Sequence, residues 1–85
     1  MGEIDLVCMD GETLVIVEVR LREKSALVGP IDSVDRRKQR KLTLATKHLI
    51  AKHPEFQSRP IRFDVVGITC DGNSHEIEWV VSAFP

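Results

Sequence analysis

Residues 13–21 of this 85-residue chain read Thr-Leu-Val-Ile-Val-Glu-Val-Arg-Leu, the most strand-prone stretch of the sequence. Branched aliphatic side chains dominate this stretch, and they favour extended strands. Residues 3–9, Glu-Ile-Asp-Leu-Val-Cys-Met, form a second strand-like run just before it. The dipeptide Asp10-Gly11 between the two runs is a strong hairpin signal. The two runs are therefore expected to pair as antiparallel neighbours.

The rest of the chain predicts one helix and two further strands. Ser33 can cap a helix that runs to about His53, because Pro54 marks a stop. Residues 61–70 and 76–82 have strand character. Residues 22–32, with Gly29-Pro30, are best interpreted as a loop. The order β-β-α-β-β predicts an α/β fold, with a mixed sheet and a flanking helix, in a single domain over residues 1–85.

Composition excludes several classes of protein. The net charge of −1 argues against polyanion binding by bulk electrostatics, so the distribution of charge matters more than its sum. No apolar run approaches the ~20 residues needed to span a bilayer, so we expect no membrane association. Cys8 and Cys70 lack metal-ligand spacing and are expected to be buried free thiols in a cytoplasmic protein. No small-molecule cofactor is indicated.

Three carboxylates lie on the two N-terminal strand-like runs. Residues two apart share a strand face, so Glu3 and Asp5 share a face of the first strand, and Glu18 and Arg20 share a face of the second. The length of the turn decides whether these two faces coincide. A two-residue loop at positions 10–11 would set Glu3 opposite Glu18, with Asp5 diagonal to it. A four-residue loop at 10–13 would set Asp5 directly opposite Glu18. A three-residue loop would separate the carboxylates onto opposite faces and abolish the site.

Carboxylates in such apolar surroundings are costly, because like charges and burial both disfavour ionisation. A divalent cation removes that cost, and hard oxygen ligands favour Mg²⁺ or Mn²⁺. Glu3, Asp5 and Glu18 are therefore candidate metal ligands, in an arrangement able to support phosphodiester hydrolysis. The simpler interpretation is an ion pair between Glu18 and Arg20 at a sheet edge, with Asp5 solvated at a strand end.

Residues 36–41 carry five cations in six positions within the first turns of the predicted helix, where the helix dipole disfavours positive charge. Phosphate is the obvious partner. Gln39, among them, can donate and accept hydrogen bonds near a scissile phosphate or its water. A solvated helix face is the alternative. The candidate nucleic-acid-binding residues are Arg36, Arg37, Lys38, Arg40 and Lys41.

Two other side chains have structural interpretations. Asp64 lies mid-strand, on the face opposite Phe63 and Val65, and is favoured as a hydrogen-bonded structural carboxylate over a supporting role at the acidic site. Trp79 is most simply a core residue.

The motifs together resemble one family over essentially the whole chain. They are residues 2–7 (Gly-Glu-Ile-Asp-Leu-Val), residues 15–20 (Val-Ile-Val-Glu-Val-Arg), Lys38-Gln39 with Leu42, residues 62–66 (Arg-Phe-Asp-Val-Val), and the closing Trp79 with Ala83-Phe84. This pattern resembles the YraN-like family, small bacterial proteins regarded as predicted endonucleases related to archaeal Holliday junction resolvases.

The resemblance implies a PD-(D/E)xK nuclease fold acting on branched or structured DNA with a divalent metal. By position, Asp5 and Glu18 would be metal ligands, and Arg20 would occupy the lysine position. Arginine stays protonated, so Arg20 would orient a water or clamp a phosphate and could not act as a base. Family members usually carry a helix before this motif, and this chain starts at the motif. We therefore expect an exposed apolar sheet face and a homodimer that covers it.

Three functions remain open from the sequence. The first is a metal-dependent endonuclease, with Asp5, Glu18, Arg20 and Gln39 as its catalytic residues. The second is a nucleic-acid-binding module that keeps the fold without catalysis. The third is a structural or assembly domain that dimerises through its sheet.

Overall fold

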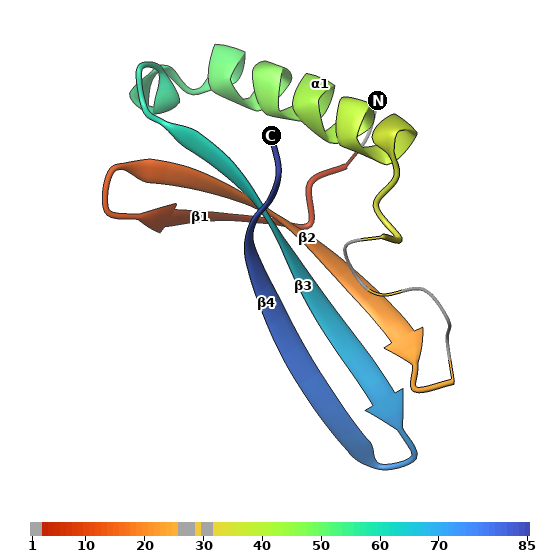
Figure 1. The fold of residues 1–85 in the computed structure, drawn as a ribbon. Coiled ribbons are helices and arrows are strands. Elements are labelled where there is room, and N and C mark those ends of the chain that lie inside the picture. Colours follow the sequence, from red (N-terminus) through yellow and green to blue (C-terminus); the bar gives the residue numbers. More distant parts are fainter. Residues whose placement is uncertain (1–2, 26–28, 30–31) are drawn as a thin grey trace.

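The computed structural model describes residues 3–25, 29 and 32–85, and has one helix beside a four-stranded mixed sheet (Figure 1). The strands lie in the order β1-β2-β3-β4; β2 and β3 are parallel, and the other neighbours are antiparallel. This confirms the α/β class and is consistent with a restriction-endonuclease-like fold. The elements are β1 (Leu6–Asp10), β2 (Thr13–Glu23), α1 (Arg36–Lys52), a 3-10 turn (Pro54–Phe56), β3 (Ile61–Asp71) and β4 (Ser74–Phe84).

The hairpin between β1 and β2 fixes the register on which the acidic site depends. Leu6 pairs with Val17, and Asp10 pairs with Thr13. Gly11 supplies the positive φ (59°) that the tight turn needs. The turn is shorter than the four-residue loop considered above but gives the same register. Continued by one residue, this register sets Asp5 beside Glu18.

The first strand begins later than the sequence predicts. Residues 3–5 were expected to extend it, but β1 starts at Leu6. Ile4 instead packs against the core cluster of Val34, Leu42, Val65 and Phe84. Burial of the Ile4 side chain against this cluster favours the departure of the chain from the sheet.

Helix α1 covers one face of the sheet through this same core cluster. Its N-cap is Asp35, whose Oδ1 accepts a hydrogen bond from the Lys38 backbone N–H at 2.9 Å. The expectation that Ser33 caps the helix was wrong, because the Ser33 hydroxyl accepts a hydrogen bond from Arg20 instead. The helix ends at Lys52, and Pro54 opens the 3-10 turn, as the proline predicted.

The face of the sheet turned away from α1, here called the outer face, carries a second apolar cluster. Val15, Val17 and Val66 are buried there, with Cys8, Val19 and Ile68 packed against them. Trp79 pairs with Val66 on this face and is 53% exposed, so the expectation that it lies in the core was wrong. No helix among the described residues contributes to this cluster. The expected exposed apolar face is therefore present.

Asp64 connects three strands across the outer face. Its carboxylate accepts hydrogen bonds from Arg62 Nε and Nη2 (3.0 and 3.1 Å), from Trp79 Nε1 (2.8 Å) and from the Ser82 backbone N–H (3.0 Å). Arg62 also reaches Asp10 on β1 at 2.7 Å. A fully buried carboxylate with this many donors is a structural group, as the sequence favoured.

Part of the loop expected before the helix lies outside the described residues. The expected loop over residues 22–32 includes 26–28 and 30–31, and β2 extends through its first two positions. A helix suited to spanning a bilayer, in length and in apolar content, is absent from the described part of the chain. Cys8 and Cys70 are both free, as expected, but the expectation that they are buried was wrong, because both are only half-buried.

Candidate active site

Glu18 lies in the middle of β2, on the face that α1 covers, and is only 3% exposed. Its Oε1 lies 3.5 Å from Lys38 Nζ on α1 and 3.6 Å from Arg20 Nη1 on β2. These distances permit ion pairing but exceed those of good hydrogen bonds. Its Oε2 is buried and has no hydrogen-bond partner among the described residues. The carboxylate is therefore buried with only part of its binding capacity used.

The pKa of Glu18 is raised above its ordinary value of 4.5. Burial of the carboxylate is the largest cause, and the nearby negative charge of Asp5 adds to it. The cations of Lys38 and Arg20 pull the pKa of Glu18 back down without cancelling the rise. A further cation at this carboxylate would stabilise its ionised form.

Asp5 lies one residue before β1 and reaches across to β2. Its Oδ2 accepts a hydrogen bond from the Val19 backbone N–H at 2.9 Å, which fixes the carboxylate next to Glu18. The side chain of Asp5 is exposed, whereas that of Glu18 is buried. The structure thus brings together the two acidic residues on which the sequence argument rested.

Glu3 does not join Asp5 and Glu18. It was expected as a third metal ligand on the same strand face, but it precedes β1 and is exposed. Within the described part of the chain, no three His, Cys, Asp or Glu side chains are grouped so that they could hold a metal ion. Because the chain leaves the sheet before Leu6, strand periodicity does not set the position of Glu3.

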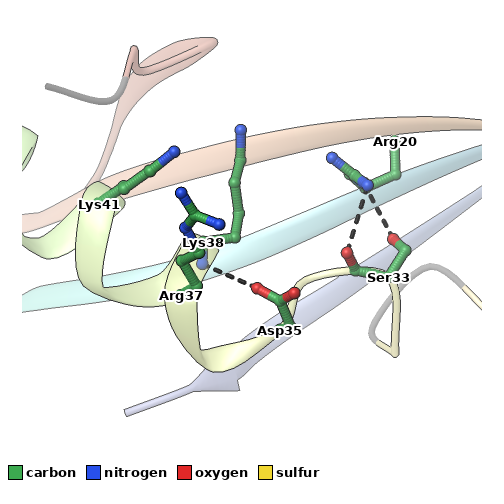
Figure 2. Close-up of a pocket in the computed structure, with 6 residues that line it drawn as sticks. All are labelled: Arg20, Ser33, Asp35, Arg37, Lys38 and Lys41. Atoms are coloured by element: carbon green, nitrogen blue, oxygen red, sulfur yellow. Dashed lines mark hydrogen bonds between the residues drawn. The ribbon is translucent and has the colours of Figure 1, made fainter.

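Ser33 holds the guanidinium of Arg20, a role that the sequence does not predict. Arg20 Nε donates to Ser33 Oγ at 2.9 Å, and Arg20 Nη2 donates to the Ser33 backbone carbonyl at 3.2 Å (Figure 2). These two bonds orient the guanidinium while its Nη1 faces Glu18. A serine just before a helix predicts an N-cap from sequence alone. Only the tertiary structure shows that Ser33 binds Arg20.

The side chains around Arg20 form a hollow of about 350 Å³, here called the basic hollow. Figure 2 shows Lys38 between Arg20 and Lys41, with Arg37 on the same side of α1. Four cations and one carboxylate share this surface, so it favours anions. It is lined by Arg20, Ser33, Asp35, Arg37, Lys38 and Lys41.

The other residues expected at the site face a different hollow. Arg36, Gln39 and Arg40 lie with Thr43 and residues 83–85 around a space of about 580 Å³. Gln39 Nε2 donates to the Val34 backbone carbonyl at 3.0 Å. The structure therefore divides the five cations of residues 36–41 between two sides of α1, with Gln39 on the side away from the basic hollow.

The donor set is compatible with a hard divalent cation. Asp5 and Glu18 offer carboxylate oxygens, and Glu18 Oε2 is a buried acceptor without a partner among the described residues. Two carboxylates suffice for Mg²⁺ or Mn²⁺ when waters and substrate phosphates complete the shell. Burial, with the charge of Asp5, raises the pKa of Glu18 despite the two neighbouring cations, so an added cation would favour its ionised form. These two side chains would hold the ion.

Fold and site define an α/β protein with a restriction-endonuclease-like sheet and an acidic pair next to a basic hollow. The family model of the uncharacterised protein family UPF0102 matches residues 1–68. The chain therefore belongs to UPF0102, the YraN-like family.

Individual relatives agree over nearly the whole chain. A UPF0102 protein of Stutzerimonas stutzeri is 46% identical over 83 residues, covering 98% of this chain and 69% of that protein. One of Alcanivorax borkumensis is 46% identical over 84 residues, covering 98% and 67%. One of Nitrosococcus oceani is 43% identical over 84 residues, covering 99% and 68%.

Proposed function

We propose that this protein is a cytoplasmic, metal-dependent endonuclease that hydrolyses phosphodiesters in branched or structured DNA. The observation that carries the proposal is the pairing of Asp5 with the buried Glu18, directly beside the basic hollow. Acidic ligands for a cation and a cationic surface for a phosphate are the two parts that phosphodiester hydrolysis requires.

Each residue has a distinct part in this proposal. Asp5 and Glu18 hold Mg²⁺ or Mn²⁺, which when bound polarises the phosphate and lowers the pKa of a water. Arg20, oriented by Ser33, binds a phosphate oxygen next to Glu18. Arg37, Lys38 and Lys41 neutralise the neighbouring backbone. Gln39 and the arginines on its side of α1 contact a more distant stretch of nucleic acid.

The proposal is tested by incubating junction, flap, single-stranded and duplex DNA with the protein and either metal. We expect cleavage of at least the junction or flap, and its loss in Asp5→Asn and Glu18→Gln. Both substitutions preserve side-chain shape while removing a metal-binding charge. Complete absence of cleavage on all four substrates with both metals would contradict the proposal.

A nucleic-acid-binding module without catalysis is the second candidate, and the basic hollow favours it on its own. Such a module binds DNA without a metal and loses affinity when Arg37 and Lys41 in the basic hollow, or Arg36 and Arg40 on the other side of α1, are neutralised. Asp5→Asn leaves its binding intact. Metal-dependent cleavage that disappears in Asp5→Asn would exclude it.

An assembly role is the third candidate, favoured by the apolar outer face. A second copy of the chain would cover this face and form a homodimer. Charge changes in the basic hollow leave such an association unaffected. Loss of association on neutralising Arg37 and Lys41 would argue against a contact through the outer face.

A further inference from the structure

Lys38 links the two halves of the candidate site. Its backbone N–H is fixed by the helix cap Asp35, and its side chain extends from there to β2. Its ammonium Nζ ends 3.5 Å from Glu18 Oε1. The same side chain lines the basic hollow and is 37% exposed (Figure 2). One flexible cation thus lies between the buried carboxylate and the anion-favouring surface.

We propose that Lys38 is an internal counter-ion of Glu18, which a divalent cation displaces when it binds. This inference rests on the metal site of the proposed function. The contact at 3.5 Å is longer than a good charge-assisted hydrogen bond, so breaking it costs less than breaking a short, well-aligned one. Glu18 Oε2 has no partner among the described residues, so the lysine leaves half of the carboxylate unused.

Lys38, and not Arg20, is the cation free to move. Arg20 is fixed by two hydrogen bonds to Ser33, and moving it would break both. Among the described residues, the Lys38 side chain makes no ion pair other than that with Glu18. Its stem has four rotatable bonds, and its ammonium is a strongly hydrated point charge. The lysine can therefore exchange Glu18 for solvent or phosphate.

Displacement changes the basic hollow as well. A Lys38 ammonium released from Glu18 stays attached to α1 and adds its unpaired charge to those of Arg37 and Lys41. Cation binding at Glu18 therefore strengthens anion binding in the basic hollow. By thermodynamic linkage, an anion in the hollow strengthens cation binding at Glu18 to the same degree. Lys38 would thus couple the two ligands.

The test is the affinity of the full chain for Mn²⁺ alone, measured from the electron paramagnetic resonance signal of free Mn²⁺. Lys38→Met removes the competing cation, and we expect it to bind Mn²⁺ about five- to tenfold more tightly than the wild type. Lys38→Gln serves as a second variant. Lys41→Met removes an equal charge from the same hollow without touching Glu18 and should have a smaller effect. Lys38→Arg keeps the charge and should show no gain.

A second measurement repeats the titration with sulfate as the anion probe. Sulfate should raise the Mn²⁺ affinity of the wild type by a larger factor than that of Lys38→Met. If Lys38→Met and Lys38→Gln bind Mn²⁺ as the wild type does, or more weakly, the counter-ion inference is overturned. The metal site itself survives that result provided Asp5→Asn loses Mn²⁺ binding. If neither the wild type nor the Lys38 variants bind Mn²⁺, both the inference and the metal site are overturned.

Discussion

Glu18 occupies a position where an aliphatic residue would pack without cost. It follows four buried aliphatic residues, 14–17, on a central strand, and its own carboxylate is buried. Lys38 and Arg20 offset part of that cost from 3.5 and 3.6 Å, longer than a good charge-assisted hydrogen bond. A buried carboxylate with an unpartnered oxygen reduces the stability of the fold. Buried titratable groups with a shifted pKa are frequent at functional sites, so Glu18 is a candidate ligand-binding residue.

Glu18→Gln should therefore stabilise the fold at neutral pH. Because the folded-state pKa of Glu18 lies above 4.5, the folded protein binds the proton more tightly than the unfolded chain. The free energy of unfolding of the wild type should fall as pH rises above 4.5, and this fall should be weaker in Glu18→Gln. The gain at neutral pH should be at most about 1 kcal/mol, because solvent in the hollow screens the charges. Urea denaturation at several pH values measures both effects.

Asp64 is the opposite case, a buried carboxylate with every donor it needs. Burial alone would raise its pKa, but the hydrogen bonds from Arg62, Trp79 and Ser82 outweigh burial and lower the pKa of Asp64 below 3.8. The stability it contributes is present above pH 3.8 and is lost as pH falls through its lowered folded-state pKa.

Asp64→Asn should destabilise the protein at neutral pH by about 2–4 kcal/mol. The asparagine N–H₂ group would replace one carboxylate oxygen and face the N–H donors of Arg62, Trp79 or Ser82, to which it cannot hydrogen-bond. Thermal or urea unfolding at pH 7 measures the loss. The exposed Asp71→Asn is a matched control, since the Asp71 carboxylate pairs among the described residues with the exposed Lys24 alone. Equal stability of the two variants would contradict a structural role for Asp64.

At the level of elements, the sequence predicts strand pairing better than strand ends. The Asp10-Gly11 signal and the apolar runs give the β1–β2 hairpin, because turn chemistry and local periodicity act between neighbours in the chain. The start of β1 and the cap of α1 depend on contacts made across the fold. Ile4 leaves the sheet for the core cluster, and Ser33 binds Arg20, which no local pattern reveals.

The candidate site shows the same division. Strand periodicity and register predict that Asp5 and Glu18 lie together, and they do. The contact of Lys38 with Glu18 joins α1 to β2, and β2 ends 13 residues before α1 begins. The position of Lys38 therefore depends on how α1 packs against the sheet. The split of residues 36–41 into two sides of α1 likewise depends on the helix rotation.

The basic side of α1 should make binding to nucleic acid sensitive to salt. Arg37→Gln with Lys41→Gln should lower the slope of log affinity against log salt by about 1.5, since each phosphate contact contributes about 0.7–0.9. Lys47→Gln with Lys52→Gln removes the same charge from the far end of the helix and should change the slope little. Fluorescence anisotropy with labelled DNA at several salt concentrations gives both slopes. Equal slopes for the two double variants would contradict a role for the basic hollow.

At the scale of the whole molecule, the sheet has two unlike faces. One is covered by α1 and holds the candidate site. The outer face has exposed Leu6, Leu21, Ile77 and Trp79 beside the buried valines of the same face. Contiguous apolar surface of this kind is typical of a contact with another protein surface.

Self-association through the outer face should be lost in Leu21→Lys with Ile77→Lys, because each lysine would place an unpaired charge in the contact. Leu44→Lys is a matched control, since Leu44 is an exposed apolar residue on α1. Sedimentation equilibrium at high protein concentration distinguishes the variants. A wild type that remains monomeric throughout would contradict the homodimer.

The central claim is that Asp5 and Glu18 together hold a divalent cation, and a crystal structure with Mn²⁺ tests it most directly through anomalous scattering. We expect one Mn²⁺ peak that contacts both carboxylates, with the Lys38 ammonium moved from Glu18 into the basic hollow. A crystal saturated with Mn²⁺ in which no peak lies between Asp5 and Glu18, and in which Lys38 still pairs with Glu18, would contradict it.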